Sequence, residues 1–195
     1  PCTLQRVKLK ASGPSLHFVV ADLNAAKNTV QILSSLHACF PFAKNDMQAG
    51  MHQYVNSNSS ISSEAIAAIE TGDVLALAAC MRQAQQSFDS GAAPNCPEQL
   101  TAPVLHSLID DPQLQYLLQQ PSKKGSEQDQ NLGVLAVKGI GSQGDGSCQL
   151  LCLDEDRQSK VIAYLKERYG MTAFALTLTP TEEEGEENGA AEEGR

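Results

Sequence analysis

The sequence predicts an α+β fold built on a four-stranded antiparallel sheet. Two apolar runs, residues 132–137 and 148–153, are too short for helices and rich in Leu, Val and Cys, so they predict paired strands. Further strands are predicted at residues 16–21 and 172–179, and helical patterns separate them from this pair. With the middle helices treated as one enlarged crossover, this order matches a ferredoxin-like split βαβ sheet with helices packed on one face.

A strand and a helix are predicted at the start of the domain. The apolar residues 16–21 predict a strand that Asp22 ends. Asn24 is of a helix-capping type and Pro41 stops helices, so a helix is expected between them. Its apolar face is expected at Ala26, Val30, Leu33 and His37, flanked by Ile32 and Leu36.

Helices are predicted through the middle of the chain. Residues 43–60 are polar and are predicted to form a linker, after which Ser62 or Ser63 begins a helix that Gly72 ends. Asp73 is expected to cap the next helix. Four residues of that helix fall on one face and predict core packing: Leu77, Met81, Ala84 and Phe88.

A shorter helix is expected near Thr101, with Pro103 in its first turn. An Asp-Pro step interrupts it at Asp111, and residues 121–131 predict a solvated loop. Between these points the apolar pattern continues at Leu114, Leu117 and Leu118.

The last helix and strand have clear end signals. Asp154 is expected to cap the helix and Gly170 to close it, while residues 172–179 alternate large and small side chains as a strand does. The large residues of that strand are Phe174, Leu176 and Leu178, and the buried face of the helix is expected at Val161, Ile162, Leu165 and Tyr169.

Composition predicts one domain with two flanking segments. A chain of 195 residues, 42% of them hydrophobic, can bury one sizeable core, which we expect at residues 16–179. Basic and apolar residues alternate in residues 1–15, which predicts an exposed strand or the remnant of a missing N-terminal half. Residues 180–195 form an acidic tail that is expected to be disordered.

Charge and cysteine content exclude some functions. The net charge of -9 argues against a nucleic-acid partner, and no apolar run is long enough to span a membrane. The six cysteines include no C-x-x-C pair and predict no metal site; they suit buried free thiols of an intracellular, cytoplasmic protein.

The loop between the paired strands, residues 139–147, reads GIGSQGDGS and is the main functional candidate. Its four glycines allow positive φ repeatedly, so successive N–H groups can converge on an anion. The G-x-G-x-x-G spacing fits a dinucleotide fold only if a helix follows, and here a strand follows; the lysine of a Walker A loop is also missing. We therefore predict a phosphate-facing loop, with a ligand-free glycine-rich hairpin connection as the alternative.

The stretch VLAVKGIGSQGDGSCQLL resembles the C-terminal glycine-rich motif of the GHMP kinases, which include galactokinase, homoserine kinase, mevalonate kinase and phosphomevalonate kinase. In that family, a strand ending near a Lys leads into a glycine-rich loop and a second strand. The likeness rests on Lys138, Gly139, Gly141, Gly144, Gly146 and Cys148, whereas Ser142, Gln143 and Asp145 depart from the motif. Asp145 is expected to be a turn or metal-side residue rather than a base.

The resemblance implies the C-terminal portion of an ATP- and Mg²⁺-dependent kinase that phosphorylates a small hydroxylated metabolite, a sugar or a mevalonate-like alcohol. The implied phosphate or substrate loop comprises Lys138, Gly139, Gly141, Ser142, Gln143, Gly144, Asp145, Gly146 and Ser147. Nothing in the sequence matches the family's serine-rich ATP loop or its acceptor-activating Asp. The resemblance therefore implies that an N-terminal half of the same polypeptide completes the site, that this chain holds no catalytic residue, and that alone it is inactive.

The turn from residues 21 to 29 is the second candidate, because the family has a basic residue and a Thr after the matching strand. Lys27 is expected to neutralise a phosphate and Asp22 to orient a hydroxyl, with Thr29 beside them on the substrate side. The alternative is that Asp22 and Asn24 cap a helix and Lys27 is solvated. For the whole chain, the alternative function is a non-catalytic ferredoxin-like module, or pseudokinase fragment, that binds a ligand or a protein.

Overall fold

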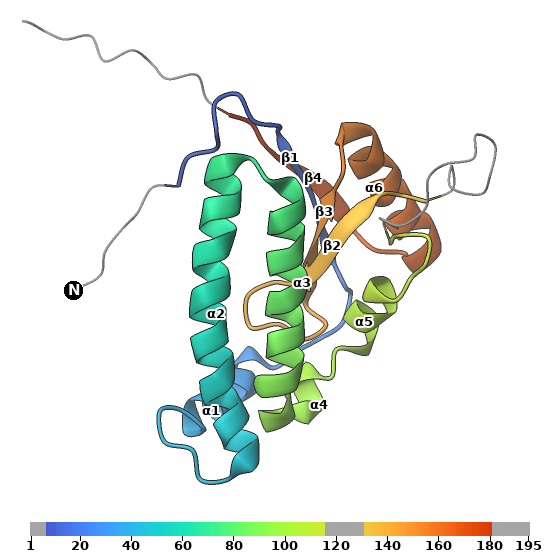
Figure 1. Cartoon of the computed structure of the whole chain (residues 1–195). Coiled ribbons are helices and arrows are strands. Elements are labelled where there is room, and N and C mark those ends of the chain that lie inside the picture. The colour runs from blue at the N-terminus through green and yellow to red at the C-terminus, as the bar shows by residue number, and fades with distance from the viewer. Residues whose placement is uncertain (1–6, 116–130, 181–195) are drawn as a thin grey trace, which may run out of the picture.

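The computed structural model describes residues 7–115 and 131–180, and these fold around one antiparallel sheet (Figure 1). The order of its four strands is β2-β3-β1-β4, with every neighbouring pair antiparallel. The predicted α+β class and four-stranded antiparallel sheet are confirmed. The strands are β1 (Leu16–Asp22), β2 (Val134–Gly139), β3 (Ser147–Cys152) and β4 (Ala173–Leu178).

Six α-helices and one 3-10 turn, Ala93–Asn95, occur in the described residues. The signals at Asp73, Asp154, Gly72 and Gly170 act as predicted, because each aspartate accepts an amide hydrogen at a helix start and each glycine ends a helix with positive φ. The helices are α1 (Thr29–Ala38), α2 (Asp46–Thr71), α3 (Val74–Gly91), α4 (Pro97–Leu100), α5 (Pro103–Ile109) and α6 (Glu155–Tyr169).

Successive residues of β1 pack in different clusters. Val19 is in a cluster with Val161 and Leu165 of α6 and with residues of α5. Phe18 points the other way and packs with Leu77 and Met81 of α3. The layer of α5 and α6 thus covers one face of the sheet, and the enlarged crossover adds α2 and α3 against the other face (Figure 1).

The prediction for the first helix was wrong in its start and its face. Asn24 has a φ of 56° and lies in the loop, whereas Asn28 caps the helix by accepting from the Gln31 amide at 3.0 Å. Ile32 is fully buried, but Val30 and Leu33 are 79% and 58% exposed. The 3.6-residue period fits either face of this short helix, and tertiary packing chose the one carrying Ile32.

The predicted linker at residues 43–60 and the helix start at Ser62 or Ser63 were also wrong, since α2 is a single helix of 26 residues. Asn45 caps it by accepting from the Gln48 amide. The polar composition of residues 43–60 gave no helical pattern of apolar residues, because only a narrow face of α2 is buried, where it packs against α3. There the helices come so close that a Cβ on Gly91 would lie 2.6 Å from the carbonyl oxygen of Gly50.

Residues 7–15 contain no strand in the described structure, so that prediction was wrong for them. Leu9 instead packs against the cluster on the α3 side of the sheet. Three predictions lie outside the described residues: the structure of residues 1–6, the apolar positions Leu117 and Leu118 with most of the loop at 121–131, and the tail beyond Pro180.

The five cysteines of the described residues are free and buried, as predicted. Burial raises the pKa of Cys148 and of Cys152 to about 12, and the nearby Asp154 adds to the effect at Cys152. Both thiols are therefore inert packing residues of the sheet. None of the described helices combines the length and apolarity needed to cross a lipid bilayer.

Candidate functional site

The glycine-rich loop is a compact turn joining β2 to β3. The Ile140 amide donates to the Ser147 carbonyl at 3.0 Å and closes it, and the Gln143 amide donates to the Ile140 carbonyl at 3.2 Å. Positive φ occurs at Gly141, at Gln143 and at Gly144. The repeated left-handed conformation expected from the glycines is present, and it includes one non-glycine residue.

Several loop amides are not used inside the protein. Within residues 7–115 and 131–180, the following amides donate no hydrogen bond: Gly141, Ser142, Gly144, Asp145 and Gly146. Gly141 is exposed at the tip, and a Cβ there would meet nothing within 4 Å. A run of free amides is the donor set that an anionic ligand requires.

The fold brings the two predicted segments together. Lys27 donates from Nζ to the Gln143 carbonyl at 2.8 Å, and the Leu23 amide donates to the Gly146 carbonyl at 3.1 Å. The lysine side chain lies so close that a Cβ on Gly146 would be 2.5 Å from its Cε. Burial lowers the pKa of Lys27. The ammonium group is thus held at the loop rather than solvated far from it.

The other residues of this turn lie around the same end of the sheet. Asp22 pairs across the strands with Ser147, and its Oδ1 accepts from the Asn24 amide at 2.9 Å. Thr29 is the first residue of α1 and lines an open hollow. That hollow is lined by Ala26, Lys27, Asn28, Thr29, Val30 and Gln99. The start of α1, with its partial positive charge, therefore borders the lysine.

Two glutamines that the sequence analysis missed contact the loop. Gln85 of α3 is buried and accepts from the Gly139 amide at 2.8 Å. The side-chain oxygen of Gln99 accepts from the Asn28 amide. The backbone carbonyl oxygen of Gln99 would be 2.6 Å from a Cβ on Gly144. The position of Gln85 next to Ala84, a predicted core residue, was a signal in the sequence that could have identified it. No sequence signal marked Gln99. Lys138 donates from Nζ to the Gly139 carbonyl at 3.0 Å, and burial lowers its pKa.

Asp145 caps α5 from outside that helix. Its two carboxylate oxygens accept from the Leu105 and Val104 amides at 2.8 and 3.1 Å, while Pro103 occupies the first turn, where no amide hydrogen is needed. The carboxylate belongs to a loop more than thirty residues away in sequence, so sequence inspection of α5 showed no cap. It binds the glycine loop to the crossover.

We expect Asp145→Ala to lower the free energy of unfolding by about 1–2 kcal/mol, the usual effect of losing a helix cap, and to loosen the loop. Denaturant unfolding measures the change, and Asp154→Ala, which removes the ordinary cap of α6, is the matched control. Only the first variant should broaden the NMR amide signals of residues 141–146. An Asp145→Ala protein with unchanged stability and loop signals would contradict this role.

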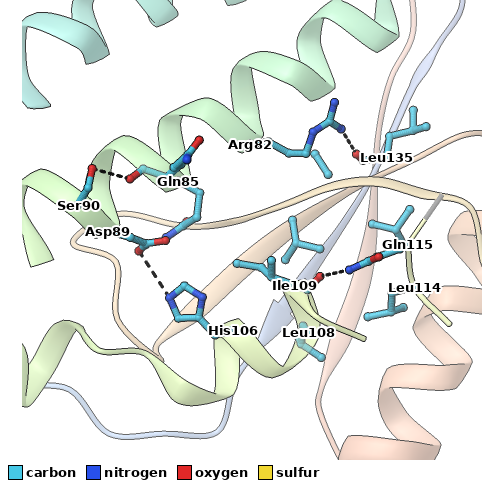
Figure 2. Close-up of a pocket in the computed structure, with 14 residues that line it drawn as sticks. Arg82, Gln85, Asp89, Ser90, His106, Leu108, Ile109, Leu114, Gln115 and Leu135 are labelled. Carbon is cyan, nitrogen blue, oxygen red and sulfur yellow. Dashed lines mark hydrogen bonds and ion pairs between the residues drawn. The ribbon is translucent and has the colours of Figure 1, made fainter. Parts of the chain in front are cut away.

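A second cavity lies elsewhere, between α3 and α5 beside β2, with a volume of about 650 Å³. Figure 2 shows Asp89 of α3 facing His106 of α5 across it, with Oδ1 and Nε2 3.6 Å apart. Apolar residues of α5 and β2, including Leu108 and Val137, form part of its wall. Gln85 lines this cavity and also bonds to Gly139, but none of the residues 139–147 of the glycine-rich loop lines it.

Comparison with known proteins supports the fold. Neither a family model nor a curated protein matches the sequence. The L. major mevalonate kinase, solved in complex with R-mevalonate, superposes with a TM-score of 0.62 at 16% identity, covering 91% of this chain and 45% of the kinase. The Streptococcus pneumoniae phosphomevalonate kinase gives a TM-score of 0.57 at 11% identity, covering 87% and 42%.

A third neighbour is the Lactococcus lactis galactokinase complexed with galactose, with a TM-score of 0.53 at 12% identity and coverage of 89% and 46%. These neighbours are GHMP-family kinases, so the chain has the fold of a domain of such kinases. It spans less than half the length of each of them.

Proposed function

We propose that this chain is the C-terminal portion of an ATP-dependent GHMP-type kinase, and that its glycine-rich loop faces the transferred phosphoryl group. The acceptor we propose is a small hydroxylated metabolite, either a sugar or a mevalonate-like alcohol. Support comes from the structural neighbours, which are a mevalonate kinase, a phosphomevalonate kinase and a galactokinase.

One observation carries the proposal: the Lys27 ammonium bonds to the Gln143 carbonyl, inside the same loop that holds the free amides. Phosphoryl transfer is catalysed mainly by positioning and by charge stabilisation. Backbone N–H groups and an ammonium are suited to both tasks at the oxygens of a phosphate. The loop would bind the phosphate, and Lys27 would offset its negative charge.

The residues present fit the phosphates of ATP but give no Mg²⁺ ligand set. The described residues hold no cluster of three or more His, Cys, Asp or Glu side chains that could bind a metal ion. Asp145, a metal-side candidate in the sequence, is committed to the α5 amides. We therefore assign the metal ligands, the ATP base site and the acceptor-activating group to an N-terminal half of the same polypeptide.

We expect ATP added to the isotope-labelled 195-residue chain to shift the NMR amide signals of Gly141, Ser142 and Gly144, without turnover. Lys27→Met should weaken this binding roughly tenfold, the effect of losing about 1.4 kcal/mol of charge-assisted contact. Lys166→Met, on the exposed side of α6, is the control and should bind ATP as the original chain does. The proposal would be refuted if ATP left the loop signals unchanged, or if the Lys27→Met and Lys166→Met variants bound ATP with equal affinity.

The cavity between α3 and α5 favours the second candidate function, a non-catalytic ligand-binding module. Its volume of about 650 Å³ falls within the range of small-molecule sites, and it combines an apolar wall with a few polar groups. The same titration separates the two functions. Shifts confined to the signals of Gln86, Ser90 and Ile109, with none in the glycine loop, would favour the module.

A further inference from the structure

The two edges of the sheet differ in how their outward backbone groups are satisfied. On β2, the Val134 amide donates to the Leu114 carbonyl, and Arg82 donates to the Leu135 carbonyl. Further along, Gln85 accepts from the Gly139 amide and Lys138 donates to the Gly139 carbonyl. Long side chains and a neighbouring segment therefore protect most of this edge, as is usual for exposed strands.

The edge formed by β4 has no such protection. Because the Asp22 amide donates to the Thr172 carbonyl, alternate residues of β4 bond to β1, and the N–H and C=O groups of the others point outward. These outward residues are Ala173, Ala175 and Thr177. In the part of the chain that the structure describes, their main-chain groups have no hydrogen-bond partner. The strand carries no charge.

An apolar stripe runs along the same strand. Phe174, Leu176 and Leu178 are 58%, 45% and 41% exposed, although they share a sheet face with the buried Leu16 and Phe18. Helix α3 packs over the β1 residues of this face and leaves the β4 residues uncovered. Three large adjacent apolar side chains beside an open, uncharged edge are the features of an interface rather than of a solvated surface.

We propose that β4 pairs with β4 of a second copy of this chain, antiparallel about a two-fold axis at Ala175. In this register Ala175 faces its own copy, and Ala173 faces Thr177 of the partner subunit. All three outward residues are then paired, and each facing pair exchanges two main-chain hydrogen bonds. Phe174 lies opposite Leu176 of the partner subunit, so the two stripes form one apolar surface.

A second copy fits this edge because the strand is complementary to itself. Registers shifted by one pair in either direction leave outward groups of β4 unpaired. The uncharged strand lets two copies meet without local repulsion, despite a net charge of -9 on each chain. One strand and three side chains bury less than the roughly 800 Å² per partner of a standard interface. The dimer should therefore dissociate in the micromolar range rather than be permanent.

Sedimentation velocity of the 195-residue chain over about a hundredfold range of concentration tests the proposal. We expect reversible conversion of monomer to dimer. Ala175→Pro should abolish the dimer and leave the monomer folded, because it removes an amide hydrogen that has no partner within one chain. Leu176→Lys should raise the dissociation constant at least tenfold. Leu33→Lys, at an exposed leucine of α1, is the control and should dimerise as the original chain does.

Two results would overturn the proposal. The first is a chain that sediments as a monomer at every concentration, in which case another partner or another part of a longer polypeptide covers the edge. The second is a dimer whose dissociation constant is the same in Ala175→Pro and in the original chain while circular dichroism shows both folded. The proposal does not depend on the proposed kinase function, since neither ATP nor the glycine loop enters the test.

Discussion

Gly144→Ala should lower the free energy of unfolding by about 3 kcal/mol, more than the same change at Gly141. Two effects add at this residue. Its φ of 70° lies in the left-handed region, where a side chain costs roughly 1–2 kcal/mol. A Cβ would also lie 2.6 Å from the backbone carbonyl oxygen of Gln99, which cannot rotate away as a flexible side chain would.

Gly141→Ala is the matched control for this change. Its φ of 64° is nearly the same, but nothing lies within 4 Å of the added carbon, so only the conformational effect of roughly 1–2 kcal/mol is expected. Denaturant unfolding of the two variants measures the difference. Equal destabilisation would mean that the loop does not pack against the segment carrying Gln99. Gly144→Ala should also weaken ATP binding in the NMR titration, because the loop must shift away from the Gln99 carbonyl and its free amides move with it.

Asp111→Asn should lower the free energy of unfolding by roughly 2 kcal/mol at neutral pH, because it breaks a buried network around a charged group. Asp111 is 8% exposed and accepts from the hydroxyls of Tyr164 and Tyr169 at 2.8 and 2.7 Å and from the Gln113 amide at 2.9 Å. These bonds join the chain after α5 to the end of α6.

The same contacts predict how stability depends on pH. Burial by itself would raise the pKa of Asp111, but the hydrogen bonds from Tyr169, Tyr164 and the Gln113 amide, with the Arg168 charge, outweigh it and lower that pKa. A lowered pKa in the folded state stabilises the protein above the unfolded value of about 4, and the contribution is lost as pH falls through the folded value. The difference between the original protein and Asp111→Asn should therefore shrink in acid.

Chemical unfolding at neutral pH and near pH 3 measures this effect. Asp110→Asn, at the exposed neighbouring aspartate, should change stability little at either pH. If Asp111→Asn proves as stable as the original protein at neutral pH, the network does not hold the end of α5 to α6. If instead the loss is the same at both pH values, the carboxylate charge is not what the network stabilises.

Local chemistry was enough to predict most elements of the fold from the sequence. The apolar runs on either side of the glycine loop pair as β2 and β3, Asp73 and Asp154 cap their helices, and the alternation at residues 172–179 forms β4. Such signals act over a few residues, so they are readable along the chain. The wrong predictions fell where packing decides. Residues 46–60 belong to helix α2 because a narrow side of that helix packs against α3, and Ile32 is buried in place of Val30.

That a glycine-rich turn with repeated positive φ joins two strands follows from the residues of the turn, because only their own conformational freedom is needed for it. The surroundings of the turn, by contrast, depend on how distant segments pack together. That packing placed Lys27 on the Gln143 carbonyl, gave Asp145 to the start of α5, and put Gln85 against Gly139. These contacts join residues 40 to 116 positions apart, and that distance is closed only when the sheet and its crossover fold together.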